Sequence, residues 1–195
     1  MKKIILVITM LGVILSCQKE ENEPTPTVTD IDGNQYRTIQ IGTQVWMAEN
    51  LKTSKYCNGD PIQNIDDAIQ WANLTTGAWS HYNIEIENRY GKFYNWYAVD
   101  DARNICPCNW HVPTKAEWTV LLDFLEGKSG DFSPLPGGIR YSHGSFDSIG
   151  EFGYWWSSTE DGIDYAWFVG YDIVFSSGDL PWPKKWGMSV RCLKD

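Results

Sequence analysis

The sequence predicts an α+β domain over residues 30–195, with short antiparallel strands, one or two helices and long irregular loops. Three features carry this prediction. They are a strand-turn-strand pattern at residues 36–48, a capped amphipathic helix that begins at residue 115, and a series of short β-type segments after residue 137. Turn-forming residues separate these segments, so a single domain with long loops is expected.

Residues 1–16 are predicted to be a lipoprotein signal peptide. Lys2 and Lys3 precede the apolar run from Ile4 to Leu15, which is too short to be a permanent membrane span. The run ends in Leu-Ser-Cys at 15–17, which resembles a bacterial lipobox. That resemblance implies that Cys17 is diacylated and becomes the new N-terminus, so that its acyl chains hold the protein at a membrane. The alternative is an ordinary signal peptide with an incidental cysteine.

Residues 17–29 are predicted to be a lipidated flexible tether. From Gln18 to Thr29 the chain is first charged and then rich in proline and threonine, with almost nothing to bury. Fully extended, these residues would span about 40 Å. The QKEE that follows Cys17 resembles the lysine-plus-acidic export signal of surface lipoproteins in Bacteroidetes-type bacteria. We therefore expect a lipid-anchored protein exposed on the cell surface at the outer membrane.

The composition excludes some partners. The formal net charge is −9, and it becomes −11 once residues 1–16 and their two lysines are removed. An acidic chain without a basic stripe argues against nucleic acid and against electrostatic adsorption to anionic lipid. The 11 tryptophans and 10 tyrosines are many for a domain of this size, so many are expected in the core and some at a ligand site.

Four cysteines remain after Cys17, at positions 57, 106, 108 and 192. In an exported chain an even number of cysteines predicts two disulfides, and four cysteines allow three connectivities. Two other hypotheses exist for the stretch CPCNWH at 106–111. A zinc site is disfavoured because Cys-x-Cys is tighter than the usual spacing, and a redox pair is normally Cys-x-x-Cys.

Residues 36–48 predict a β-hairpin. YRTIQI at 36–41 alternates and is rich in β-formers, QVWMA follows at 44–48, and Gly42 stands first in the two-residue connection, as a type II′ turn requires. Upstream, DIDGN at 30–34 looks like the start of a calcium loop, but its glycine is at the fourth position rather than the sixth. We predict a turn there.

A helix is predicted over residues 115–126, with Gly127 at its end. Thr114 and Glu117 have the spacing of a capping box, in which each side chain bonds to the backbone amide of the other residue. The apolar residues that follow lie at i, i+3, i+4 and i+7 and form one stripe. They are Trp118, Leu121, Leu122 and Leu125. The stripe predicts that this helix packs on the core.

The remaining segments have less regular sequence patterns. Residues 65–71 predict a short helix, whereas YGKFYNWYAV at 90–99 fits either a strand or a buried helix. Strands are expected at 137–141, 154–158, 166–171, 173–175 and 187–193. In the last of these, Met188, Val190 and Cys192 share one face, so Cys192 is expected to point at the core.

Together these stretches resemble the Fibrobacter succinogenes major paralogous domain, a family common in bacterial lipoproteins. The matching stretches are DIDGNQYRTIQIGTQVWMAENLK at 30–52, YGKFYNWYAV at 90–99, CPCNWHVPTKAEWTVLL at 106–122, GGIR at 137–140, YWWSSTE at 154–160 and GMSVRCLKD at 187–195. The resemblance implies a C-type-lectin-like superfold. It also implies a disulfide between the family cysteines Cys106 and Cys192, which leaves Cys57 and Cys108 for a second bridge. Cys108 and Asn109 depart from the usual family pattern.

The sequence predicts that the protein is not an enzyme. No Gly-x-Ser-x-Gly, P-loop or His-Glu-x-x-His motif occurs, and His81, His111 and His143 are dispersed along the chain. His111 is interpreted as a half-buried imidazole held by backbone groups near the helix start. We expect no cofactor and no metal site, with calcium as the alternative for the ligand site.

A ligand site is predicted in the loops before the last strand. The resemblance to C-type-lectin-like domains implies a site in this region, where GDLPWPKKW at 178–186 holds Trp182 between two prolines. A rigid aromatic face suits stacking on a sugar, and nearby carboxylates could bind hydroxyls or calcium. The candidate ligand-binding residues are Trp182, Trp186, Asp179, Asp161 and Asp164. The alternative is that the tryptophans only cover the core and the aspartates make turns.

We therefore expect a surface-anchored, non-catalytic lipoprotein that acts as a binding module, with a glycan as its ligand. The alternative is a protein-interaction module, such as an accessory subunit of an outer-membrane uptake complex or an adhesin. In both cases the protein is expected to contact the membrane through its lipid anchor. Its second partner is a glycan in the first case and an outer-membrane protein in the alternative.

Overall fold

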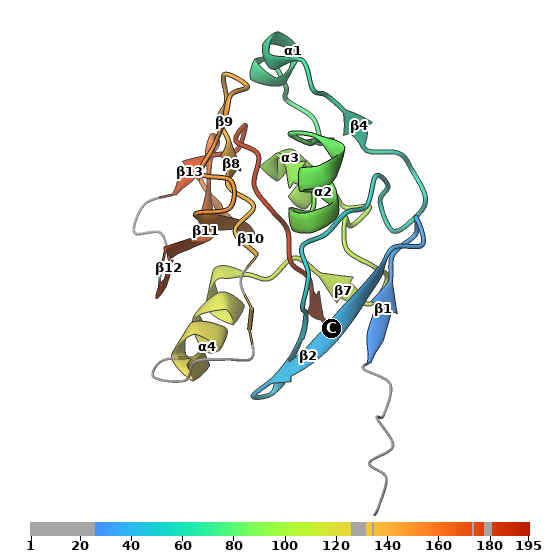
Figure 1. The fold of residues 1–195 in the computed structure, drawn as a ribbon, viewed down its shortest axis with the longest axis vertical. Helices are drawn as coiled ribbons and strands as arrows, with labels where there is room; N and C mark the ends of the chain where they lie inside the picture. The colour runs from blue at the N-terminus through green and yellow to red at the C-terminus, as the bar shows by residue number, and fades with distance from the viewer. Residues whose placement is uncertain (1–25, 126–131, 134, 173, 178–180) are drawn as a thin grey trace, which may run out of the picture.

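A computed structural model describes residues 26–125, 132–133, 135–172, 174–177 and 181–195 of the chain. The fold is a mixed α+β arrangement with mostly antiparallel strands and few helices, which confirms the predicted class (Figure 1). The described residues form four helices rather than one or two. Three of these are a few residues long, because each is a single capped turn or two between strands.

The described elements follow one another in an irregular order. The helices are α1 (Ala68–Ala72), α2 (Ile84–Tyr90), α3 (Trp96–Val99) and α4 (Lys115–Leu125). The strands are β1 (Thr27–Thr29), β2 (Gln35–Ile41), β3 (Gln44–Met47), β4 (Gln63–Asn64), β5 (Ala78–Ser80), β6 (Phe93–Tyr94), β7 (Trp110–His111), β8 (Ile139–Arg140), β9 (Phe146–Asp147), β10 (Gly153–Asp161), β11 (Tyr165–Asp172), β12 (Val174–Ser177), β13 (Trp182–Pro183) and β14 (Leu193–Lys194).

Four sheets organise these strands. The largest has the order β1-β2-β3-β14-β7, so the first strands of the domain lie beside its last. The second has the order β10-β11-β12, with β13 paired to β11. Two smaller sheets are β4-β5-β6 and β8-β9. Among the named strands that the structure describes, only β4 and β5 pair in parallel.

The predicted hairpin is confirmed. β2 and β3 are antiparallel, with Ile41 opposite Gln44. Gly42 has a φ of +59°, a value that a residue with a side chain rarely adopts. The hairpin tip lies against α4, since a Cβ atom on Gly42 would be 3.2 Å from the ring of Phe124.

The capped helix is confirmed as well. Thr114 Oγ1 accepts from the Glu117 amide at 3.2 Å, and the Glu117 carboxylate accepts from the Thr114 amide at 2.8 Å. The helix is described as far as Leu125, so the predicted end at Gly127 lies outside the described residues. Trp118 and Leu121 are fully buried, and α4 therefore packs on the core as expected.

The aromatic stretch at 90–99 divides into two elements. Its first part forms β6, and its second part forms α3, for which Asn95 is the N-cap. The Asn95 side chain accepts a hydrogen bond from the amide of Ala98 in α3. It accepts a second from the amide of Ala78 on β5. A strand and a buried helix therefore both occur, because Asn95 stops one and caps the other.

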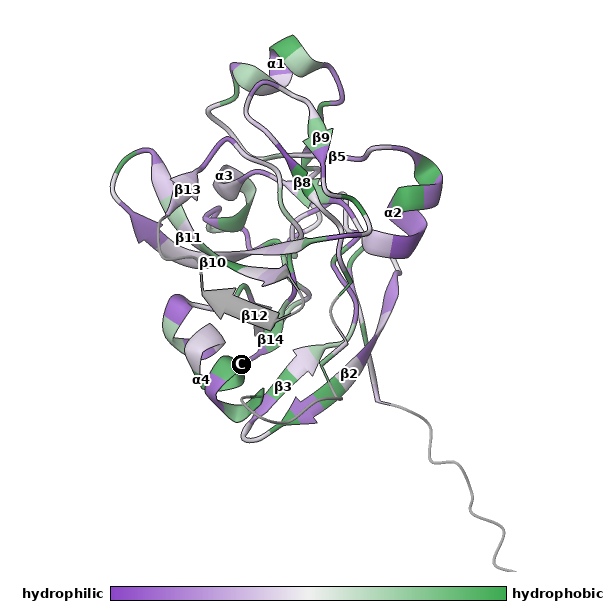
Figure 2. Cartoon of the chain, turned by 60° about the vertical axis from the view of Figure 1, so that its left-hand side comes forward, coloured by the Kyte–Doolittle hydropathy of each residue, from purple (hydrophilic) through white to green (hydrophobic). Residues whose placement is uncertain are grey.

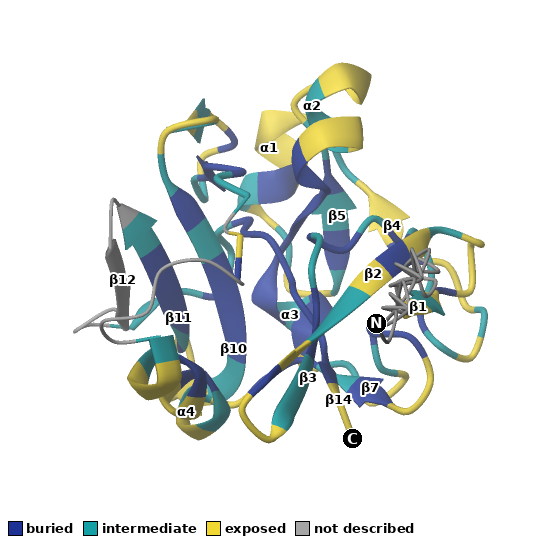
Figure 3. Ribbon diagram, turned by 60° about the horizontal axis from the view of Figure 1, so that its bottom comes forward, coloured by how far each residue is buried: buried dark blue, intermediate teal, exposed yellow. Residues whose placement is uncertain are grey.

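The chain near the C-terminus forms the centre of the molecule. Residues 187–193 are buried throughout (Figure 3). This segment bonds to one element after another: Met188 to Tyr94, Ser189 to Tyr154 and Trp156, and Val190 to Leu51. The regular strand is limited to Leu193–Lys194, so the predicted strand over 187–193 was too long.

The cysteines form the two disulfides that the family resemblance implied. Cys106 is joined to Cys192 and Cys57 to Cys108, with Cα atoms 5.9 and 5.5 Å apart. Cys106 and Cys192 are both buried, which confirms that Cys192 points at the core. Because Cys106 and Cys108 bond to different partners, they form neither a zinc site nor a redox pair with each other.

The predicted flexible tether over 17–29 was too long at its end, because Thr27–Thr29 form β1 and pair with β2. Cys17 and residues 1–25 lie outside the described residues. Within the described ranges, none of the helices is long and apolar enough to cross a membrane.

Candidate functional site

The hairpin of β10 and β11 brings several of the predicted ligand residues together. Asp161 ends β10 and lies opposite Tyr165 on β11, and Asp164 is in the connecting turn. β13 pairs with the same end of β11, where Trp182 is opposite Ala166. Asp179, the fifth candidate, lies outside the described residues.

The two candidate tryptophans make extensive contacts with other aromatic rings of the protein. The Trp182 ring stacks on Phe168 with centroids 4.0 Å apart, and it lies 5.2 Å from Tyr154. Trp186 lies 4.6 Å from Trp182 and 5.1 Å from Tyr141. Both tryptophans are partly buried against the main core, so much of their ring surface is already covered.

Lys184 fills the space inside the β10–β11 turn. Its ammonium donates to the carboxylate of Glu160 and to the carbonyl oxygens of Gly162 and Ile163, the last two at 2.9 Å. The ammonium also lies 4.5 Å from the centroid of the Trp96 ring. Carboxylate and carbonyl oxygens are the ligands that calcium prefers, and here a lysine takes them. Asp161 and Asp164 do not join this cluster of oxygens with their side chains.

A partly exposed aromatic face lies on the outer side of the same hairpin, where Tyr165 is exposed and Trp167 is half-buried. Tyr165 and Trp167 are two residues apart on β11 and therefore share a face, and Asp161 is on that face because it is directly opposite Tyr165. The Lys115 ammonium lies 3.1 Å from the centroid of the Trp167 ring. We call Asp161, Tyr165, Trp167 and Lys115 the hairpin face.

The hairpin face is open because α4 covers only part of β11. Val169 and Tyr171 share the face of Tyr165 and Trp167, yet they pack into the smaller core with Trp118 and Leu121 of α4. Tyr165 lies beyond the helix and is 47% exposed. α4 begins beside the hairpin, where the Lys115 amide donates to Thr159 Oγ1 at 2.9 Å.

Sequence analysis missed Tyr165, Trp167 and Lys115 as candidate ligand residues. The alternation in YAWFVGY at 165–171 was a usable signal, because it separates the aromatic residues into two faces. It does not say which face is covered. Only the positions of α4 and β13 show that Phe168 and Trp182 point inward and that Tyr165 and Trp167 point outward.

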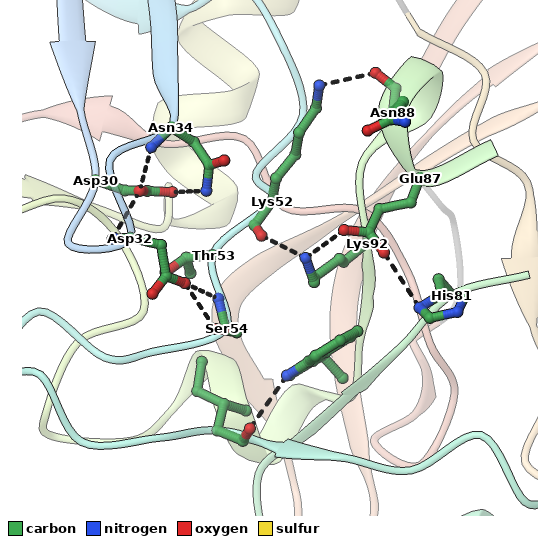
Figure 4. A network of polar contacts seen from close by, with 12 residues as sticks. Asp30, Asp32, Asn34, Lys52, Thr53, Ser54, His81, Glu87, Asn88 and Lys92 are labelled. Carbon is green, nitrogen blue, oxygen red and sulfur yellow. Dashed lines mark hydrogen bonds and ion pairs between the residues drawn. The ribbon is translucent and has the colours of Figure 1, made fainter. Parts of the chain in front are cut away.

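The turn at residues 30–34 uses its carboxylates to hold the chain together (Figure 4). Asp30 accepts from the amide of Asn34, its side chain and the Tyr36 hydroxyl. Asp32 accepts from Ser54 and forms an ion pair with Lys55 at 3.0 Å. The prediction of a turn rather than a calcium loop is consistent with this bonding. Burial raises the pKa of Asp32, but hydrogen bonds from Ser54 and Lys55 outweigh it and lower the pKa below its usual value.

A cavity of about 170 Å³ lies next to this turn. Its walls include Ile31, Lys55, Ile105 and the Cys57–Cys108 disulfide. It is small, and the Asp30 carboxylate on its wall is bonded to other parts of the protein. The Asp30 carboxylate is therefore already engaged within the protein and is a poor partner for a ligand in this cavity.

His111 is half-buried as predicted, but its partners are carboxylates rather than backbone groups. Nδ1 lies 2.6 Å from Asp195 and Nε2 lies 3.1 Å from Glu117. Burial raises the pKa of Glu117, but hydrogen bonds from Thr114 and His111 outweigh burial, so the pKa lies below its usual value. His111 thus joins the C-terminus to the start of α4. In the part of the chain that the structure describes, no three His, Cys, Asp or Glu side chains form a metal site.

Comparison with known proteins gives one match. The family model of the Fibrobacter succinogenes major domain matches residues 39–133. No curated protein and no solved structure matches the chain. The matched segment contains α4 and three of the four paired cysteines, Cys57, Cys106 and Cys108, whereas β10, β11 and β13 lie outside it.

Proposed function

This chain belongs to the Fibrobacter succinogenes major domain family, and we propose that this member is a surface-anchored, non-catalytic module that binds a neutral glycan at the hairpin face. Asp161, Tyr165 and Trp167 lie beyond the segment that the family model matches. Lys115 is the one member of the hairpin face within the matched segment, so the family match covers only part of the proposed ligand site.

One observation carries the proposal: two aromatic side chains share an outward face beside a carboxylate and an ammonium group. Aromatic rings present apolar surface to the C–H groups of a sugar, while Asp161 and Lys115 can bond its hydroxyls. The face lies on a paired hairpin that β13 and Lys184 hold in place. Little conformational entropy is lost when a ligand binds such a fixed surface.

Charge favours a neutral glycan over an acidic one. The chain has a net charge of −9, and Asp161 and Asp164 are both exposed at the tip of the hairpin. A polyanionic polysaccharide would be repelled over the whole surface, and a single lysine would not offset that repulsion.

The C-type-lectin-like superfold is part of the same proposal. Its support is the mixed α+β arrangement with long irregular loops, together with a last strand that lies in the middle of the first sheet.

The first test measures glycan binding by affinity electrophoresis. The detergent-solubilised lipoprotein is run through non-denaturing gels that contain a neutral polysaccharide such as xylan, glucomannan or starch. We expect at least one of these to retard the protein, and Trp167→Ala to weaken binding about fivefold, which corresponds to about 1 kcal/mol of lost stacking. Tyr165→Ala is expected to act in the same direction.

The matched control is Tyr82→Ala, since Tyr82 is an exposed aromatic residue that lies outside the hairpin face. It should leave the retardation unchanged. Trp182→Ala is a poorer test, because the Trp182 ring packs on Phe168 and its removal also alters the core. Equal retardation of wild type and Trp167→Ala in every retarding gel would contradict the proposal.

The second test concerns the anchor. Cys17→Ser is expected to abolish the incorporation of labelled fatty acid and to release the protein from washed membranes, because Cys17 is the proposed acylation site. Cys108→Ser serves as a control that removes a different cysteine and should keep the label. Label that persists in the Cys17→Ser protein would show that the lipid is attached elsewhere.

A further inference from the structure

Three large apolar side chains outside the hairpin face are exposed on α1, on α2 and just before α2. Ile69 on α1 is 75% exposed, Ile84 on α2 is 65% exposed, and Tyr82, just before α2, is 56% exposed. Figure 2 shows hydrophobic positions on both helices, and Figure 3 shows the same helices as largely exposed. Single exposed apolar residues are ordinary, but a group of them marks an interaction surface.

Contacts between the supporting segments make this one surface. The Tyr82 ring lies 5.4 Å from Phe146 on β9. The loop before β9 reaches α1, since a Cβ atom on Gly144 would lie only 2.4 Å from that of Ala68. The segment before α2 also reaches the start of α1, where the His81 amide donates to Asp66 at 3.4 Å. We call Ile69, Tyr82 and Ile84, with the acidic residues around them, the α1–α2 surface.

Acidic residues outnumber basic ones around these side chains, although Lys52 and Lys185 donate to backbone carbonyls of α2 and α1. Segments 63–90 and 141–151 contain a single lysine or arginine, the exposed Arg89 on α2. Their acidic residues are Asp66, Asp67, Glu85, Glu87, Asp147 and Glu151. Of these, only Glu87 is neutralised by a lysine, the buried Lys92 at 2.5 Å. The exposed apolar side chains therefore lie in a field that is acidic on balance, with Arg89 as its exposed basic residue.

α2 is fixed firmly enough to present a defined surface. Asn83 caps its start by accepting from the Ile86 amide at 2.9 Å. Farther along, Glu87 lies between Lys92 and His81, and the Lys52 ammonium donates to the Asn88 carbonyl (Figure 4). These contacts hold one side of α2 against the body of the protein, so that Ile84 and Glu85 stay on the outside.

α1 is fixed from the inside by Arg140. This guanidinium is completely buried and donates to the carbonyl oxygens of Ile65 and Asp66 at 2.6 and 2.7 Å, and to that of Gly144 at 3.2 Å. It also lies 4.3 Å from the centroid of the Trp71 ring on α1. One side chain thus fixes both α1 and the loop before β9.

From these contacts we infer that the α1–α2 surface binds a cationic, apolar segment of another protein. The apolar side chains supply the contact area, and the acidic residues select lysine or arginine on the partner. In Figure 1, α1 is at the opposite end of the molecule from the first described residues next to β1. A protein anchored through its N-terminus would present this surface away from the membrane. The inference does not depend on glycan binding by the hairpin face.

The test uses the full-length, detergent-solubilised lipoprotein and immobilised synthetic peptides. One peptide alternates lysine and leucine at helical spacing, a second replaces lysine by glutamate, and a third replaces leucine by serine. Wild type is expected to be retained by the lysine-leucine peptide and to be retained poorly by the other two. A variant with Ile69→Ser, Tyr82→Ser and Ile84→Ser should bind that peptide about tenfold more weakly.

The matched control replaces three apolar residues of similar exposure elsewhere, namely Ile31→Ser, Val120→Ser and Ile163→Ser. This control should keep wild-type retention. Equal retention of wild type and the α1–α2 variant would overturn the inference, and so would equal retention on the lysine-serine peptide. Because the α1–α2 variant keeps the hairpin face, its behaviour in the polysaccharide gels should not change, which separates the two proposals.

Discussion

Removing the buried disulfide with Cys106→Ala and Cys192→Ala is expected to lower the free energy of unfolding by about 4–5 kcal/mol. The bridge closes a loop of 86 residues, and loop closure of this length strongly restricts the unfolded chain. Both sulfur atoms are also buried in the main core, so their removal leaves unfilled space. Urea unfolding under non-reducing conditions measures the change.

The second disulfide provides the comparison. The Cys57–Cys108 bridge closes a shorter loop of 51 residues, and Cys108 is exposed. Its double alanine variant is therefore expected to lose less stability than the core pair. A smaller loss for Cys106→Ala with Cys192→Ala than for the exposed pair would contradict the role assigned to the buried bridge.

Replacing Arg140 by methionine is expected to cost about 3–5 kcal/mol of stability. Methionine keeps an apolar chain of similar length but leaves the buried carbonyl of Gly144 and the partly buried carbonyls of Ile65 and Asp66 without their donor. Burial lowers the pKa of Arg140 to about 10, with Asp66 and Asp67 opposing the shift, so the side chain is charged at neutral pH. The measurement is again urea unfolding.

The matched control for this variant is Arg103→Met. Arg103 also lies over an aromatic ring, that of Tyr56 at 4.1 Å, and it pairs with Asp60 and Asp101, but its side chain is 42% exposed. Water can replace those contacts, so the expected cost is about 1 kcal/mol or less. Similar losses for both arginine variants would show that burial of Arg140 does not set its contribution.

The Arg140 variant also connects stability with the α1–α2 surface. If Arg140 fixes α1 and the loop before β9, then Arg140→Met should weaken retention on the lysine-leucine peptide under conditions where the protein remains folded. Arg103→Met should not change that retention.

Local sequence patterns were sufficient to predict several helices and turns. Gly42 specified the turn of the first hairpin, and Thr114 with Glu117 specified the start of α4. In each case the residues that decide the structure are within a few positions of one another, so the sequence contains the whole interaction. The disulfide pairing required more than spacing, because four cysteines allow three connectivities, and the family resemblance selected the one that the structure shows.

The orientation of the aromatic residues depended on distant parts of the chain. Trp182 was chosen as a ligand residue because it lies between prolines, yet its ring packs on Phe168, and Tyr165 and Trp167 have the outward positions. In the same way, no local pattern indicated that Lys184 is buried among the oxygens of the β10–β11 turn. An alternating strand has two faces, and which of them is buried depends on the elements packed against it.

The sequence by itself determined the α+β class, the family, the capped helix and the first hairpin, because these follow from short-range patterns and from a motif. Only the tertiary structure decided which aromatic face is open, why residues 187–193 are fully buried, and which helices carry the exposed apolar residues. These features arise from contacts between residues far apart in the chain, such as Arg140 with Ile65 and Val190 with Leu51. No local pattern contains such contacts, since the energy of each depends on how the whole chain packs.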